Sequence, residues 1–287
     1  MTELQTSGPI SADVTIQIGS VHVIAGDRDE TTVSVNPTDR SRGIDVEWAE
    51  NTQVELMAGS RLVVKGPKPG GLVNTVLGRY GSIDVTVELP HGSRVDVSNG
   101  YGDVRIDGRL ADAKVRSGAG EIHVDEAGAA DLNSGAGAMS LGIAHGETRM
   151  TTAGDIRVGR IEGNAVIKNN NGKTWIDEAT GHLRVKSANG DIQVTKARST
   201  VVARTANGNI DIGEVVEGTV SMETAAGGLH VGVADGTAAW VDARTSFGRV
   251  HRSLQATERP GSTHRSVEIT ARTGFGDITV HRAQVKE

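Results

Sequence analysis

A glycine that returns at a near-constant interval is the feature that most constrains this chain. Each copy has a small polar residue, two further residues, the glycine, one residue and then an apolar-x-apolar triplet, as in Ser187-Ala-Asn-Gly-Asp-Ile-Gln-Val194. The anchor glycines are Gly102, Gly120, Gly137, Gly154, Gly172, Gly190, Gly208, Gly227, Gly248 and Gly276. The interval between them is about 18 residues through most of the series and lengthens before Gly248 and again before Gly276. This regularity indicates a repeat array.

The period and the residue types predict what one repeat forms. It is too short for a pair of helices, and the copies are rich in Val, Ile and Thr with period-two alternation. Because a single coil of short strands cannot bury its apolar face, successive coils must stack. We therefore expect an all-β, parallel β-solenoid (β-helix-like) of about ten coils of 17–21 residues. We expect these isoleucines to share a buried column: Ile122, Ile156, Ile192 and Ile210.

The repeat also predicts polar and aromatic columns. Each anchor glycine marks a sharp turn, for which glycine is suited because it reaches positive φ without a steric penalty. The preceding Asn171, Asn189 and Asn207 are expected to form a ladder of amide hydrogen bonds. At the same position in the last two coils, Phe247 and Phe275 are expected to stack as a terminal plug.

The first third of the chain differs from the rest. Residues 1–97 contain alternating strand patterns without the regularly spaced anchor glycine, and we interpret them as an irregular N-terminal β cap. Residues 98–287 form the regular solenoid, continuous with the cap in a single structural domain. Within it, Glu147 and Arg149 fall at inward positions, so we expect a one-residue slip that turns Thr148 and Met150 inward instead.

Composition excludes several classes of function. The net charge of −6, with both signs mixed, argues against a nucleic-acid partner, which requires a basic face. The absence of cysteine excludes disulfides, thiol catalysis and thiolate metal sites. No apolar run is long enough for a membrane helix, and no signal peptide is visible. We expect a cytoplasmic protein, or a cell-surface protein if the sequence is a trimmed piece.

The repeat resembles a known bacterial family. The Ser/Thr-x-x-Gly-Asp-Ile-x-Val pattern of residues 187–194 and 273–280, with the Val-Glu-Leu-Pro-His-Gly-Ser-Arg-Val entry at 87–95, is similar to the β-strand-repeat family labelled "putative adhesin". The resemblance covers nearly the whole chain. It implies a parallel β-helix-like fold, and it supplies no catalytic residues.

Metal binding has one candidate set in the regular part of the chain. Asp211, His230 and His251 share an outward position in what the spacing gives as successive coils, and two imidazoles with a carboxylate can hold Zn²⁺. The competing interpretation, which we prefer, is a solvated face with no cofactor. Calcium is disfavoured because only one half of each coil carries a glycine–acid pair.

Two features are candidates for partner binding. Trp175 occupies an outward position between Arg157 and Gln193, where it can stack on a ligand or pair with the guanidinium. The insertion between the last two coils is locally basic. Its candidate contact residues are Arg252, Arg259, His264 and Arg265.

The function predicted from these features is a non-catalytic β-repeat scaffold for binding or assembly. One alternative is a surface adhesin that binds a glycan or a protein, and another is a carbohydrate-active parallel β-helix enzyme. We expect no enzymatic activity, because no carboxylate cluster or nucleophile motif recurs in successive coils. Protein partners, self-association and glycans all remain open, with no nucleic acid and no membrane span.

Overall fold

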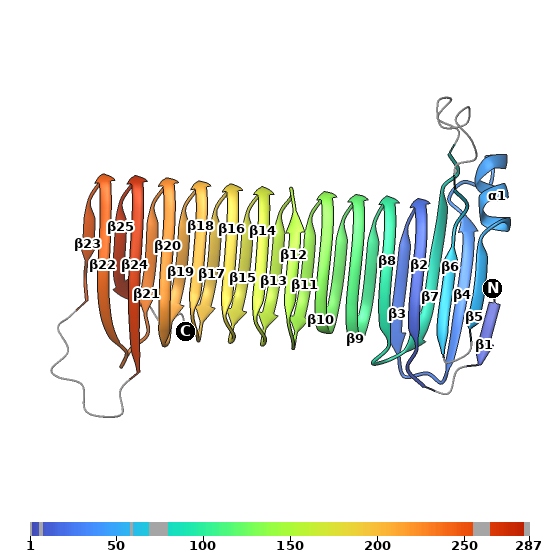
Figure 1. The fold of residues 1–287 in the computed structure, drawn as a ribbon, viewed down its shortest axis with the longest axis horizontal. Helices are drawn as coiled ribbons and strands as arrows, with labels where there is room; N and C mark the ends of the chain where they lie inside the picture. The colour runs from blue at the N-terminus through green and yellow to red at the C-terminus, as the bar shows by residue number, and fades with distance from the viewer. Residues whose placement is uncertain (1, 6–7, 58–59, 69–79, 255–264, 284–287) are drawn as a thin grey trace. The chain divides into compact units, whose positions relative to one another are not determined.

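The chain forms two compact units, Met1–Leu141 and Gly142–Glu287, each built almost entirely of β-strands. The computed structural model describes residues 2–5, 8–57, 60–68, 80–254 and 265–283 (Figure 1). Within these residues, no helix combines the length and the apolar character that a membrane crossing requires.

Unit 1 contains the single described helix and most of the irregular strands. Its elements are β1 (Thr2–Gln5), β2 (Ser11–Ile18), β3 (Val21–Gly26), β4 (Glu30–Pro37), α1 (Gly43–Glu50), β5 (Gln53–Met57), β6 (Arg61–Lys65), β7 (Ile83–Pro90), β8 (Arg94–Tyr101), β9 (Val104–Ala119) and β10 (Ile122–Ala136). The next strand, β11 (Met139–Ala144), spans the division between the units.

Unit 2 is more regular, with two short strands in each coil. Its strands are β12 (Thr148–Thr152), β13 (Ile156–Ile161), β14 (Ala165–Asn171), β15 (Thr174–Ala179), β16 (Leu183–Asn189), β17 (Ile192–Ala197), β18 (Val201–Asn207), β19 (Ile210–Val215), β20 (Gly218–Ala226), β21 (Leu229–Val233), β22 (Ala238–Phe247), β23 (Val250–Arg252), β24 (Ser266–Phe275) and β25 (Ile278–Arg282).

The strands of unit 2 build two parallel ladders. β12, β14, β16, β18 and β20 pair in register in one ladder, and β13, β15, β17, β19 and β21 pair in the other. Alternate side chains point inward, so that Ile156, Ile192 and Ile210 are fully buried, as Ile122 is in unit 1. The predicted parallel β-solenoid and its isoleucine column are confirmed.

The anchor glycines have the conformation that the turn requires. Nine of the ten predicted anchors take a positive φ, between 126° and 159°. A Cβ on Gly190 would lie 2.0 Å from the carbonyl oxygen of Gly172 in the adjacent coil, so no other residue fits. Gly154 is the exception. It comes directly after the strand for which a one-residue slip was predicted, and that slip is present, because Thr148 and Met150 are buried while Arg149 is exposed.

Polar columns link neighbouring coils along the anchor turn. Asn189 donates to Asn171 over 2.9 Å and Asn207 donates to Asn189 over 3.0 Å, which confirms the asparagine ladder. Buried threonines donate instead to a glycine carbonyl of the adjacent coil, as Thr224 does to Gly208 over 3.1 Å. The threonine bonds satisfy backbone carbonyls at the turn, and both columns fix the register of the stack.

The last two coils of unit 2 do not stack in the order of the sequence. β24 pairs with β20 on one side and with β22 on the other, and β25 lies in the same way between β21 and β23 (Figure 1). The final coil of the chain is therefore inserted between its two predecessors. β22 and β23 form the outermost coil, which the sequence assigned to the penultimate position.

Unit 1 shows the same arrangement at its N-terminal edge. β2 lies between β6 and β8, and β3 lies between β7 and β9, so the first coil of the chain is the second in space (Figure 1). Gly19 is an anchor glycine of this coil, with a φ of 127°. The regular spacing does not identify this anchor, because a long insertion separates Gly19 from Gly102.

The cap lies outside this first coil. β5 pairs antiparallel with β6, β4 pairs antiparallel with β7, and β1 pairs with β4. Trp48 of α1 is buried, and the buried carboxylate of Asp45 accepts a hydrogen bond from the Ser82 amide over 3.1 Å. An irregular N-terminal β cap is thus present, although it is made of fewer residues than predicted.

Candidate functional site

The outermost coil of unit 2 is open on one side. Among the residues that the structure describes, β22 pairs only with β24, and β23 pairs only with β25. The inward side chains confirm this exposure: Val241 and Ala243 are half-buried, whereas the residues opposite them on β24, Ile269 and Ala271, are fully buried. This coil, residues 238–252, is called the open coil below.

Large apolar side chains gather on the open coil and its neighbour. Six are exposed in the described part of the chain, and four of these belong to β22, β23 and β24. Their exposed fractions are 76% for Trp240, 66% for Phe247, 60% for Phe275 and 36% for Val250. Such a concentration on one edge is typical of a surface that another molecule covers.

The two phenylalanines stack as the sequence predicts. Their ring centroids are 4.8 Å apart with an interplanar angle of 7°. Both rings remain largely exposed, so they do not plug the end of the core. Instead they occupy the same repeat position as the asparagine ladder, because Phe275 lies opposite Ala226 and Ala226 lies opposite Asn207. The column thus becomes apolar next to the open edge.

A shallow apolar groove runs beside Trp240. Its volume is about 470 Å³, and it is lined by Ala238, Ala239, Trp240, Ser266, Val267 and Glu268. Further along β22, the side chains of Asp242 and Arg244 form an ion pair over 3.0 Å. The edge therefore combines an apolar part with one acid and one base placed two residues apart.

The predicted metal set is not brought together. Asp211 lies opposite His230, but Thr279 lies opposite both His230 and His251 and so separates the two histidines. The insertion of β25 between β21 and β23 is the reason. The long interval before Gly276 leaves room for this insertion but does not specify it.

Trp175 lies where the sequence places it, between Arg157 and Gln193. Its side chain is half-buried, with the Arg157 guanidinium 5.0 Å and the Lys173 ammonium 5.8 Å from the ring centroid. Both cations lie over the indole ring, which favours the cation–π interpretation of Trp175 over a role as a stacking surface for a ligand.

The predicted basic insertion is described only at its ends. Arg252 is exposed at the end of β23, and Arg265 is exposed directly before β24. Arg259 and His264 lie outside the described residues. Whether these four residues bind a partner remains a prediction.

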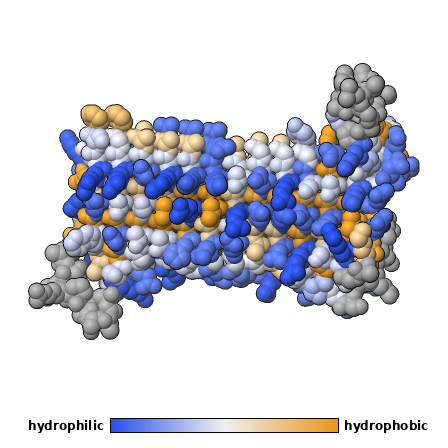
Figure 2. Space-filling model, in the orientation of Figure 1, coloured by the Kyte–Doolittle hydropathy of each residue, from blue (hydrophilic) through white to orange (hydrophobic). Residues whose placement is uncertain are grey.

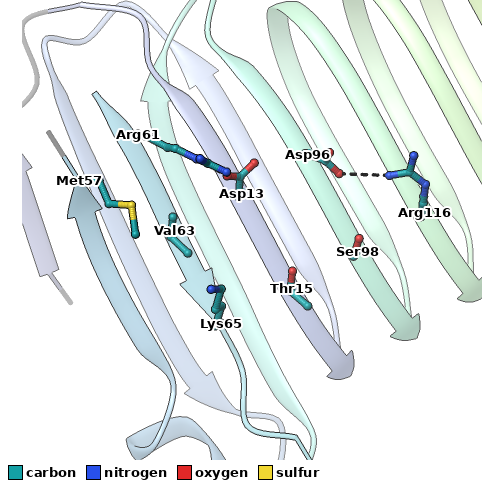
Figure 3. A pocket seen from close by; sticks show the side chains of 9 residues that line it. All are labelled: Asp13, Thr15, Met57, Arg61, Val63, Lys65, Asp96, Ser98 and Arg116. Carbon is teal, nitrogen blue, oxygen red and sulfur yellow. Dashed lines mark hydrogen bonds and ion pairs between the residues drawn. The ribbon is translucent and has the colours of Figure 1, made fainter. Parts of the chain in front are cut away.

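Unit 1 carries a polar groove of about 410 Å³ on the outward face of β2, β6 and β8 (Figure 3). Two carboxylates lie opposite each other across the strands, Asp13 and Asp96. Asp13 pairs with Arg61 over 2.6 Å, and Asp96 pairs with Lys114 over 2.7 Å and with Arg116 over 3.7 Å. Both carboxylates of this groove are thus paired, and its bases outnumber its acids.

Charged side chains also form ion pairs across the strands of unit 2, where Figure 2 shows rows of hydrophilic side chains crossing the sheet. Glu178 pairs with Arg198 over 2.7 Å and with Arg160 over 2.9 Å. The hydrogen bond from Arg198 is the main reason that the pKa of Glu178 lies below its ordinary value. This network joins three successive coils and has a structural role.

Sequence reasoning missed the open coil and Trp240. Trp240 lies at an outward repeat position that the sequence pattern predicts to be solvent-exposed in every copy. Nothing in the neighbouring residues distinguishes it as part of a binding surface. The available signal was the unusually long interval between Gly248 and Gly276, which is enough for the chain to return past one coil.

Comparison with known proteins places the chain in one family. The family model described as Toastrack DUF4097 matches residues 11–284. A search of curated proteins found no match. Among solved structures, a "putative lipid binding protein" from Parabacteroides distasonis is 12% identical, with a TM-score of 0.46 over 99% of this chain and 96% of that one.

Two further solved structures are similar over nearly their whole length. A "putative adhesin" from Bacteroides fragilis is 11% identical, with a TM-score of 0.36 over 97% of this chain and 95% of that one. A "putative cell adhesion protein" from Clostridium sporogenes is 11% identical, with a TM-score of 0.21 over 98% of each chain.

Proposed function

The chain belongs to the Toastrack DUF4097 family, and from this premise we propose that it is a non-catalytic scaffold that assembles with a second copy of itself through the open coil. The observation that carries the proposal is the contrast in burial at the last ladder step. Val250 is 36% exposed, while Ile278, opposite it on β25, is fully buried. A further strand on this edge would complete the burial.

The backbone supports an interaction by strand addition. An edge strand presents a row of unpaired N–H and C=O groups, and natural proteins usually shorten, bend or cover such edges. β22 has 10 residues and pairs regularly with β24 along its whole length. An incoming strand would gain main-chain hydrogen bonds, and its side chains would cover Val241 and Val250.

A second copy is the occupant that the chemistry of the edge favours. A two-fold axis at the open coil brings its strands together in antiparallel pairs, so that an interface centred near Ala243 sets Asp242 of each chain opposite Arg244 of the other. The cap covers the outermost strands of unit 1. A two-fold contact between two copies of the same surface closes on itself, so it leads to a dimer and not to a filament.

The experiment is the molar mass of the full chain in solution, measured by light scattering and sedimentation equilibrium over a dilution series. The expected result is a dimer of twice the 29.9 kDa chain mass that dissociates on dilution. Replacing Trp240 and Val250 by Lys should give a folded monomer. The matched control is Tyr101→Lys, which places a charge at a 64% exposed aromatic position in unit 1 and should leave the dimer intact.

A monomeric wild-type chain at every concentration, or a dimer that survives both lysine substitutions, would overturn the proposal. Higher oligomers that grow with concentration would also contradict it, because they require a second open surface. The melting temperature of each variant establishes that it is folded.

A further inference from the structure

Two histidines and two aspartates line the outward face of unit 1, far from the open coil in the sequence, and three of them have ligand atoms close to one another. The four residues are His22 on β3, Asp107 on β9, and His123 and Asp125 on β10. His22 and His123 both lie opposite Arg105, one on each side of β9, so β9 separates the two histidines and only His123 lies close to both aspartates. Asp107 comes two residues after Arg105 on β9, and Asp125 comes two residues after His123 on β10. Residues two apart in a strand share a face, so all four side chains point to the same face.

The distances within this cluster are short. His22 Nε2 lies 2.6 Å from Asp107 Oδ2, and His123 Nε2 lies 2.8 Å from Asp125 Oδ1. Asp107, His123 and Asp125 each offer a ligand atom within 4.8 Å of the others. All four side chains are half-buried, which limits the water that competes for them.

Neighbouring groups hold two of the ligands in place. The Ser140 hydroxyl lies 2.6 Å from His123 Nδ1, and the Gly108 amide donates to Asp125 Oδ2 over 3.0 Å. When Nδ1–H donates to Ser140, Nε2 carries the free lone pair that a metal needs. Histidines that bind metals are usually oriented by such a partner on the other ring nitrogen.

Arg105 is the group that opposes a cation. Its guanidinium binds Asp107, with Nη2 2.7 Å from Oδ1 and Nε 2.9 Å from Oδ2. The side chain of Arg105 is 57% exposed and can swing away into solvent. The Asp107 carboxylate then loses its guanidinium partner and can face the site, but the positive charge of Arg105 weakens the attraction of the site for a metal ion.

We infer that Asp107, His123 and Asp125 form a binding site for a divalent transition metal, with Zn²⁺ as the ion that one imidazole and two carboxylates suit, while His22 orients the Asp107 carboxylate. Zn²⁺ takes four nitrogen and oxygen ligands at about 2.0–2.2 Å, whereas Ca²⁺ and Mg²⁺ prefer sets made only of oxygen. The ion would replace the proton that His123 now shares with Asp125.

The test is Zn²⁺ titration of the full chain after treatment with a chelator, followed by calorimetry and by competition with a chromophoric chelator. One ion per chain should bind. His123→Ala should weaken binding by more than about 100-fold, and Ser140→Ala by about 10-fold, as for other groups that orient a metal ligand. Arg105→Gln should bind more tightly than the wild type, an effect that a purely structural cluster would not produce.

His230→Ala is the matched control, because His230 also lies opposite an aspartate, Asp211, but in unit 2. It should leave the affinity unchanged. The inference fails if Zn²⁺ binds the wild type no more tightly than the His22→Ala/His123→Ala double variant, or if His230→Ala removes the binding. Thermal melting of each metal-free variant shows whether it is folded, and if His123→Ala does not fold, His123→Gln and Arg105→Gln provide the same comparison.

Discussion

The N-terminal edge of unit 1 and the C-terminal edge of unit 2 follow the same topology but end differently. In each, the coil that carries the chain terminus is held between two others, and a coil from further inside the sequence is outermost. In unit 1, Leu62 and Val64 of the outermost coil are fully buried. In unit 2, the corresponding inward residues Val241 and Ala243 are half-buried.

The difference lies in what covers the last parallel strand. β5, β4 and α1 cover unit 1 with antiparallel strands and the buried ring of Trp48. The described residues provide no such layer on the outer side of β22 and β23. Placing the first or last coil in the second position pairs that coil on both sides, but it does not protect the ladder edge. A cap, or a partner, is still needed there.

The largest expected effect compares equivalent inward residues at the two edges. Leu62→Ala at the capped edge should destabilise the protein by about 2–5 kcal/mol, because a fully buried side chain leaves a cavity. Val241→Ala at the open edge should cost less than about 1 kcal/mol in dilute monomer, since its side chain is already half exposed. Denaturant unfolding of each variant measures both values.

Equal losses at the two positions would show that the open coil is as well packed as the capped one. A Val241→Ala loss that grows with protein concentration would sharpen the comparison, because it would locate additional burial in the dimer.

A second comparison uses two anchor glycines that lie side by side. A Cβ on Gly276 would lie 2.1 Å from the Gly227 carbonyl oxygen, and a Cβ on Gly248 would lie 2.0 Å from the Gly276 carbonyl oxygen. Gly276→Ala should cost about 1–3 kcal/mol or more, since the inserted coil is held on both sides. Gly248→Ala should cost less, because the open coil can shift outward. Differential melting curves decide, and a larger loss for Gly248→Ala would contradict the order of the coils.

The smallest expected effect is a pH dependence of the cap. The hydrogen bond from Arg28 is the largest cause of a pKa for Glu88 below its ordinary value of 4.5. The pair therefore stabilises the folded state fully above that ordinary value, and its contribution is lost as the pH falls through the lowered pKa. We expect less than about 1 kcal/mol, because both side chains are partly exposed.

The measurement is the unfolding free energy of wild type and Glu88→Gln from neutral to acidic pH. The difference between them should shrink as the solution is acidified below the ordinary value. A difference that stays constant or widens with acid would exclude the Arg28–Glu88 pair as a stabilising element of the cap.

Much of the fold can be predicted from the sequence, because each coil in a stack needs the same residue types at the same positions. The period gives the coil, the apolar pairs give the core, and the columns at Asn189 and Phe275 follow from register alone. The resemblance to the adhesin-labelled repeat family is confirmed by the family match. The order of the coils could not be predicted, since a period fixes the size of a coil and not which neighbour it pairs with.

The unpredicted order of the coils also explains why the candidate metal residues could not be grouped correctly from the sequence. The predicted neighbours His230 and His251 are separated by Thr279 because β25 is inserted between them. His22 and Arg105 lie on adjacent strands although several strands and α1 separate them along the chain. Alignment of the segment Gly19-Ser-Val21-His-Val23 with the later copies was the one signal that pointed to this pairing.

Hydrogen–deuterium exchange of the open coil tests the central claim most directly. We expect the backbone amides of residues 238–247 and 250–252 to exchange quickly in dilute solution and to become protected as the concentration rises, because a second copy then pairs with them. The amides of β5 and β6 in unit 1 should show no dependence on concentration. Protection of the open coil that is equal at all concentrations, or concentration-dependent protection that appears only in unit 1, would contradict the account.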